Sequence, residues 1–89
     1  MLTELKPQYT NVKSFYRKAT VEATSTGLKL YSYDTLVAVL DYDFSLVNFY
    51  NTEAYSNTTL KHVREFLMQN GFPWLSKSEI LKDDYLEIP

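Results

Sequence analysis

The chain has 89 residues, 45% of them hydrophobic, and a formal net charge of −2. This length fits a single domain, and the charge lacks the positive excess of a typical nucleic-acid binder. The absence of cysteine excludes disulfides, thiolate nucleophiles and cysteine-based zinc sites. No secretion signal opens the chain, and the longest apolar run, Leu36 to Leu40, is far shorter than the about 20 residues of a membrane span. We therefore expect a cytoplasmic protein with no membrane partner.

Residues 1–13 have little periodicity, and we expect an N-terminal arm that is either disordered or covers a sheet edge. From Ser14 apolar and polar side chains alternate, which is typical of half-buried strands. Residues 14–50 are predicted to form four short strands in an antiparallel meander. The predicted strands are 14–23, 28–33, 36–41 and 44–50, and the unbroken apolar run of the third favours a central place in the sheet.

The connections between these strands differ in how well their residues define a turn. Ser25-Thr26-Gly27 has turn chemistry, with Gly27 able to take a positive φ. Asp34-Thr35 contains no glycine and is compatible with either a bulge or a tight reversal. Asp41-Tyr42-Asp43 is the third candidate turn.

The C-terminal half predicts two helices. A main helix over 56–70 would be capped by Ser56 or Asn57, and Asn70-Gly71 would end it. Its apolar stripe is Leu60, Val63, Phe66 and Leu67, whereas Lys61, Arg64, Glu65 and Gln69 fall elsewhere. Ser76 and Glu79 have capping-box spacing, which predicts a short helix over 76–82. Trp74 and Leu75 are expected to close over one end of the core, and the tail from Tyr85 is either a short edge strand or a frayed end.

These elements predict an α+β fold in one domain, 1–89. A four-stranded antiparallel sheet would pack against one main C-terminal helix, with a short extra helix.

The sequence offers little catalytic chemistry. His62 is the one histidine, so a triad or an imidazole metal site has too few partners. We interpret it as a half-buried histidine with a hydrogen-bond partner, or as a contact to an anion at the helix start. The two glycines cannot make a glycine-rich phosphate loop. We expect no enzyme activity, no metal and no other cofactor.

Two features could carry binding. The helix start combines free N–H groups with hydroxyl and basic side chains, which suits an anion or nucleic acid. Ordinary capping with a solvated basic face is the simpler interpretation. These residues are Thr58, Thr59, Lys61, His62 and Arg64. On the sheet, Tyr31 and Tyr33 with Asp34 could anchor a protein partner or stack on bases. They could also pack under the arm or the tail.

The runs Leu30–Ala38 (LYSYDTLVA) and Tyr55–Leu67 (YSNTTLKHVREFL) resemble a pattern in small uncharacterised proteins of bacteriophages and mobile elements of Gram-positive bacteria. The resemblance covers Ser14–Phe72. It implies an accessory protein that binds and blocks a host protein, such as an anti-CRISPR inhibitor of a Cas nuclease. The implied mechanism is steric or electrostatic competition with nucleic acid. Candidate contacts are Tyr31, Tyr33, Asp34, Asp41, Asp43 and Glu53.

Two alternatives stay open. One is a small nucleic-acid-binding or regulatory module that uses the basic helix start. The other is a structural or assembly protein that oligomerises through an exposed sheet edge.

Overall fold

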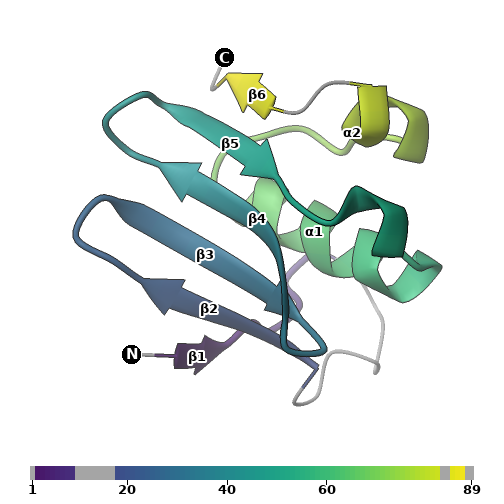
Figure 1. Cartoon of the computed structure of the whole chain (residues 1–89), viewed down its shortest axis with the longest axis horizontal. Coiled ribbons are helices and arrows are strands. Elements are labelled where there is room, and N and C mark those ends of the chain that lie inside the picture. Colours follow the sequence, from purple (N-terminus) through teal and green to yellow (C-terminus); the bar gives the residue numbers. More distant parts are fainter. Residues whose placement is uncertain (1, 10–17, 83–84, 88–89) are drawn as a thin grey trace.

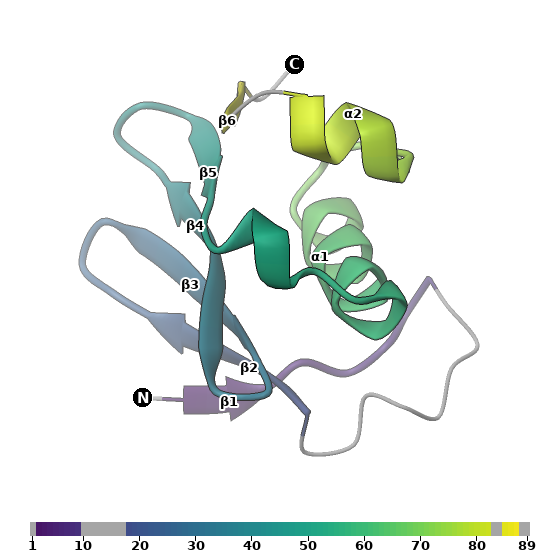
Figure 2. The ribbon, with the colours of Figure 1, turned by 45° about the vertical axis from the view of Figure 1, so that its right-hand side comes forward.

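The structure, a computed structural model, describes residues 2–9, 18–82 and 85–87. In this part of the chain six strands form one antiparallel sheet in which each strand pairs with its sequence neighbour (Figure 1). The strands are β1 (Leu2–Glu4), β2 (Ala19–Ala23), β3 (Gly27–Ser32), β4 (Thr35–Asp41), β5 (Leu46–Phe49) and β6 (Tyr85–Glu87). The helices α1 (Asn57–Gln69) and α2 (Lys77–Lys82) lie on the same side of the sheet (Figure 2). A 3₁₀ turn, η2 (Thr52–Ala54), joins β5 to α1.

The predicted α+β class, the meander and both helices are confirmed. The predicted number of four strands was too low, because three-residue strands at both ends of the chain extend the sheet. β1 pairs with β2, with Leu2 opposite Glu22, and β6 pairs with β5, with Leu86 opposite Val47. Residues 10–17 lie outside the described part, so the predicted start of a strand at Ser14 is not described; β2 begins at Ala19.

The fourth predicted strand, 44–50, is shorter than expected. β5 covers only Leu46–Phe49, because Ser45 has a left-handed φ of 53° that ends the extended chain. Phe44 therefore belongs to the loop that joins β4 to β5.

The connection between β3 and β4 contains both features that the sequence left open. Tyr33 and Asp34 take φ values of 52° and 68°, as in the two-residue hairpin turns that follow the twist of a sheet. A register shift also falls beside Leu30 and Tyr31, which places Val37 and Ala38 of β4 both in the buried core. The chain thus reverses tightly and carries a bulge.

Gly27 serves a different purpose from the predicted one. Its φ is not positive, and the positive-φ glycine of the described part is Gly71. A Cβ on Gly27 would lie 1.8 Å from the Leu40 backbone oxygen, far inside van der Waals contact. Glycine is therefore required because β4 approaches β3 closely at this point.

The core lies between the inner face of the sheet and the helices. Leu30, Leu40 and Val47 of the sheet meet Val63 and Phe66 of α1, and all five side chains are buried. Both ends of the main helix are capped as predicted. Ser56 Oγ accepts a hydrogen bond from the Thr59 N–H at 3.1 Å, and the Phe72 N–H returns to the Leu67 carbonyl at 3.0 Å, with Gly71 left-handed at φ 92°.

The helix α1 is buried over more than the predicted stripe, and two interpretations were wrong. His62 has the expected hydrogen-bond partner, Ser32, but is fully rather than half buried. Glu65, expected off the apolar face, is also fully buried. The N-terminal segment explains the burial of Glu65. This segment runs along the flank of α1 opposite α2 (Figure 2), and its Leu5 enters the core. Of Trp74 and Leu75, which were expected to close one end of the core, Leu75 packs against it partly buried, but Trp74 is 58% exposed. Phe72 and Ile80 are buried in the core as well. In the described part, no helix has the length and apolar character needed to cross a membrane.

Candidate functional site

The residues predicted to bind a partner fall at the two opposite ends of β4. Asp34 precedes this strand and Asp41 is its last residue, and the strand's seven residues span about 23 Å at about 3.3 Å per residue. Glu53 belongs to the Asp34 end, because the neighbouring Asn51 side chain donates to the Leu36 carbonyl at 2.8 Å. Asp34, Asp41, Asp43 and Glu53 therefore do not form one acidic patch.

Tyr31 and Tyr33 point to different faces of the sheet. Tyr31 lies on the outer face, away from the helices, and its hydroxyl donates to Glu22 Oε1 at 3.1 Å. Burial, and after it this hydrogen bond, raise the pKa of Tyr31. A shallow hollow of about 320 Å³ opens here, lined by Leu2, Thr20, Glu22, Tyr31 and Asp34.

Tyr33 leaves the alternation because its left-handed conformation turns the side chain toward the helix. Its ring centroid lies 5.8 Å from that of His62, and Lys18 Nζ lies 5.9 Å from the ring centre. The Tyr33 N–H donates to the Lys18 carbonyl at 2.8 Å. We refer to Tyr33 and Asp34 as the β3–β4 turn.

A buried polar cluster lies beneath this turn. Ser32 Oγ lies 2.8 Å from His62 Nδ1 and 3.1 Å from Thr59 Oγ1, and all three residues are buried. A buried hydroxyl or imidazole needs such partners to offset its desolvation. The cluster joins the end of β3 to the first turns of α1, so Thr59 and His62 serve the interior.

The remaining residues of the predicted anion site do not converge. Lys61 is exposed and Thr58 is half buried. Arg64 turns toward the chain after α1, where its Nε donates to the Leu75 carbonyl at 2.7 Å and its guanidinium lies 4.6 Å from the Trp74 ring centre. With Thr59 and His62 buried, the basic helix start presents Lys61 and little else to an anion.

The loop between β4 and β5, residues 42–45, presents two aromatic side chains that the sequence reasoning did not select. Phe44 is 73% exposed and Tyr42 is 56% exposed. Asp41 Oδ1 accepts the Asp43 and Phe44 N–H groups at 2.9 and 3.2 Å, and the Tyr42 N–H donates to the Thr26 carbonyl at 2.8 Å. The alternation of acidic and aromatic residues from Asp41 to Phe44 was the available signal. We call residues 41–45 the acidic–aromatic loop.

Glu65 holds the N-terminal segment against α1. Its carboxylate accepts the Gln8 N–H at 2.9 Å, the Tyr9 N–H at 3.0 Å and the Gln69 side-chain amide at 2.6 Å. Gln69 also donates to the Lys6 carbonyl at 2.8 Å. These hydrogen bonds hold residues 6–9 against α1.

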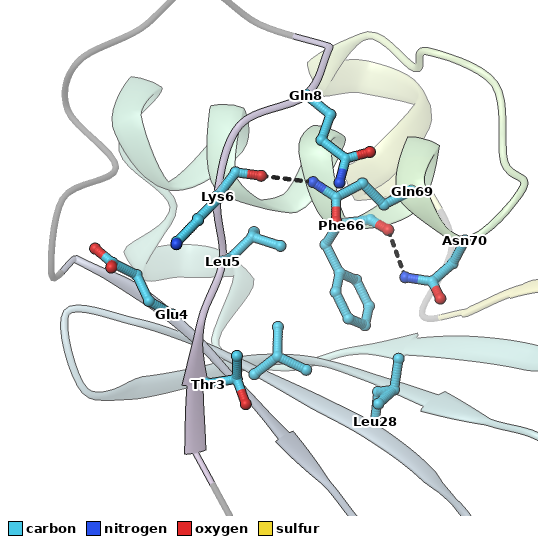
Figure 3. Close-up of a pocket in the computed structure, with 10 residues that line it drawn as sticks. Thr3, Glu4, Leu5, Lys6, Gln8, Leu28, Phe66, Gln69 and Asn70 are labelled. Atoms are coloured by element: carbon cyan, nitrogen blue, oxygen red, sulfur yellow. Dashed lines mark hydrogen bonds between the residues drawn. The ribbon is translucent and has the colours of Figure 1, made fainter.

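A pocket of about 450 Å³ opens beside this segment, between the sheet and the C-terminal end of α1. Figure 3 shows Leu5, Leu28 and Phe66 turned toward its interior, with Gln8 and Gln69 above them and Asn70 beside Phe66. The charged ends of Glu4 and Lys6 point away from this space (Figure 3). No local sequence pattern indicates the pocket, because its lining comes from four parts of the chain: the N-terminal segment, β2, β3 and the end of α1. Among the residues that the structure describes, no group of three or more His, Asp or Glu side chains could hold a metal ion.

These features define a small α+β protein whose six-stranded meander carries its helices on one face. The chain belongs to a family of unknown function, DUF8033, whose profile matches residues 3–82. No curated protein and no solved structure matches the chain significantly.

Proposed function

We propose that this protein acts without catalysis, by binding another protein, and that it is an inhibitor of a host defence nuclease of the anti-CRISPR type. The observation that supports this proposal is the acidic–aromatic loop. Two aromatic rings and two carboxylates stand together at the end of the β4–β5 hairpin, outside the core. Exposed aromatic side chains are the usual anchors of protein interfaces.

The charge of the loop favours a partner that ordinarily binds nucleic acid. A nucleic-acid channel offers lysine and arginine for phosphates, and often aromatic or guanidinium planes for bases. Asp41 and Asp43 can pair with such cations, and the rings of Tyr42 and Phe44 can occupy the stacking positions. A loop of this composition would compete with the nucleic acid for the same channel.

The conformation of the loop favours binding because little order has to be created on contact. The hydrogen bonds of Asp41 to Asp43 and Phe44 and the bond from Tyr42 to Thr26 hold its backbone before any partner arrives. Preorganisation reduces the entropy cost of association. The exposed rings can then act as rigid anchors.

The test uses the tagged protein as bait in host lysate, followed by mass spectrometry and by a cleavage assay on the captured nuclease. Phe44→Ala should weaken binding and inhibition by about 30-fold or more, the effect of an anchor worth about 2 kcal/mol. Asp43→Lys should act in the same direction. Asp41→Asn keeps an oxygen acceptor for the Asp43 and Phe44 N–H groups, so it should lose less binding and inhibition.

Glu53→Lys is the matched control, because it makes the same charge reversal at the opposite end of β4. It should bind and inhibit as the wild type does. If Asp43→Lys and Phe44→Ala retain full inhibition, the loop is not the contact. If the wild type captures no nuclease, the proposed target class is wrong.

A further inference from the structure

We propose that the pocket between the sheet and the C-terminal end of α1 is a binding site for a small uncharged molecule with an apolar body and a hydrogen-bond donor. This site is separate from the acidic–aromatic loop, and the inference does not depend on the proposed inhibition. Its volume, about 450 Å³, lies within the range of small-molecule sites, roughly 300–1,000 Å³.

The apolar part of the pocket is its floor and inner wall. Val21 of β2 and Leu28 of β3 form the floor and are only partly buried although they pack against the core. Phe66 closes the inner wall and Leu5 the side (Figure 3). A flat apolar ligand on Val21 and Leu28 would remove their remaining surface from water, at roughly 25 cal/mol per Å² buried.

The polar part of the pocket consists of two side-chain amides whose orientation is fixed. The Gln69 amide nitrogen donates to Lys6 and to Glu65, and the Asn70 amide nitrogen donates to the Phe66 carbonyl at 2.7 Å. Each bond can be made only by the NH₂ group, so both amide oxygens remain as acceptors. Within the described residues neither oxygen accepts a hydrogen bond. Both residues line the pocket, and their oxygens are the acceptors that a ligand with an N–H or O–H group would use.

The charge of the lining selects an uncharged ligand. Glu4 and Lys6 contribute to the wall, but their charged groups point away from the space enclosed by Leu5, Leu28 and Phe66 (Figure 3). The other polar residues at the mouth, Thr3, Gln8, Gln69 and Asn70, are neutral. A charged ligand would lose hydration without gaining a counter-ion.

The test follows the full chain by two-dimensional NMR during titration with indole, 1-methylindole and indole-3-carboxylate. Indole should cause saturable shifts at the Val21 and Leu28 methyl groups and at the Gln69 and Asn70 side-chain amides. The 1-methyl compound lacks the donor and should bind about 3- to 10-fold more weakly, the effect of one hydrogen bond. The carboxylate should bind more weakly still.

Leu28→Phe should fill the pocket and remove the saturable shifts, with Leu36→Phe on the outer face as a control that keeps them. Val21→Phe tests the same space from β2 if Leu28→Phe does not fold. The inference is overturned if the shifts are scattered over the surface, if a folded filling variant binds indole as the wild type does, or if 1-methylindole binds equally well.

Discussion

The β3–β4 turn and the acidic–aromatic loop are built from similar residues but relate to the fold in opposite ways. Each contains a Tyr-Asp pair and at least one non-glycine residue in the left-handed region, and they lie at opposite ends of β4. In the turn, the Tyr33 ring faces His62 and Lys18, above the buried Ser32–Thr59–His62 cluster. In the loop, Tyr42 and Phe44 are directed to solvent and only the backbone is held.

The difference shows that exposed tyrosine and aspartate do not by themselves indicate a binding site. In the turn, the Tyr33 ring packs beside the buried His62 imidazole at one end of the fold. The loop uses its hydrogen bonds to fix the backbone while the rings contribute nothing to the core. The apolar surface that the fold leaves unused is what makes the loop a candidate for a partner.

The largest expected effect comes from His62→Ala, compared with Phe44→Ala. Removing the fully buried imidazole leaves a cavity and takes a partner from Ser32, so we expect a loss of about 3 kcal/mol in the free energy of unfolding. Phe44→Ala should change it by less than about 0.5 kcal/mol. Urea denaturation followed by circular dichroism measures both, and equal losses would abolish the distinction between turn and loop.

A smaller effect is expected for the two tyrosines. Tyr33→Ala removes the ring contact with His62 and the contact with Lys18, and should cost about 1 kcal/mol in stability. Tyr42→Ala removes a ring with no such neighbours in the described part and should cost less than about 0.5 kcal/mol. Thermal unfolding of the pair provides the comparison. A larger loss for Tyr42→Ala would mean that the loop, too, supports the fold.

Asp34→Gly should stabilise the protein, by about 0.5 kcal/mol. Asp34 has a φ of 68°, a conformation that favours glycine over residues with a Cβ. Ser45→Gly, at φ 53°, is the matched change in the loop and should have a similar effect. Since both gains arise in the backbone, unequal gains in urea denaturation would reveal a side-chain contribution at one of the two sites.

The features that could be predicted from the sequence are those set by a few adjacent residues. The Ser56 cap, the helix end at Asn70-Gly71 and the Ser76–Glu79 capping box each need only three or four positions. The strand alternation gave the meander for the same reason. Each of these signals lies within the element that it defines.

The features that could not be predicted depend on residues far apart in the chain. Glu65 looked like a solvent-facing position because its partners, Gln8 and Tyr9, are 57 and 56 residues away. His62 is buried against Ser32, 30 residues away. The strands β1 and β6 have three residues each, too few for a pattern, and form by pairing with a neighbour. The pocket combines residues from the N-terminal segment, β2, β3 and the end of α1, so no local motif indicates it.

The smallest expected effect concerns the stability of α2. Its capping box shows whether exposed side chains that bond to each other stabilise the fold, as the side chains of the turn do and those of the loop do not. The capping box of α2 is exposed like the loop, but its side chains bond to each other: Ser76 N–H donates to Glu79 Oε1 at 3.0 Å, and Glu79 N–H donates to Ser76 Oγ at 3.3 Å. Hydrogen bonds from the Ser76 backbone and side chain lower the pKa of Glu79 below its usual 4.5. Because the pKa of Glu79 is lower in the folded than in the unfolded protein, these hydrogen bonds add their full stability at pH values above the unfolded-state pKa. That stability is lost as the pH falls through the folded-state pKa.

We therefore expect the protection of the α2 amides, taken relative to the intrinsic exchange rate at each pH, to fall on acidification below the usual glutamate pKa, while the amides of β3 and β4 keep their protection. Hydrogen-exchange NMR across this range measures it. Glu79→Gln, whose side chain can still accept the Ser76 N–H but cannot ionise, should show no such step in α2. If wild-type α2 opens at the same pH as the sheet, or if the Gln variant shows the same step, the capping box does not stabilise this helix on its own. Exposed hydrogen bonds would then contribute as little to the fold as the exposed rings of the loop.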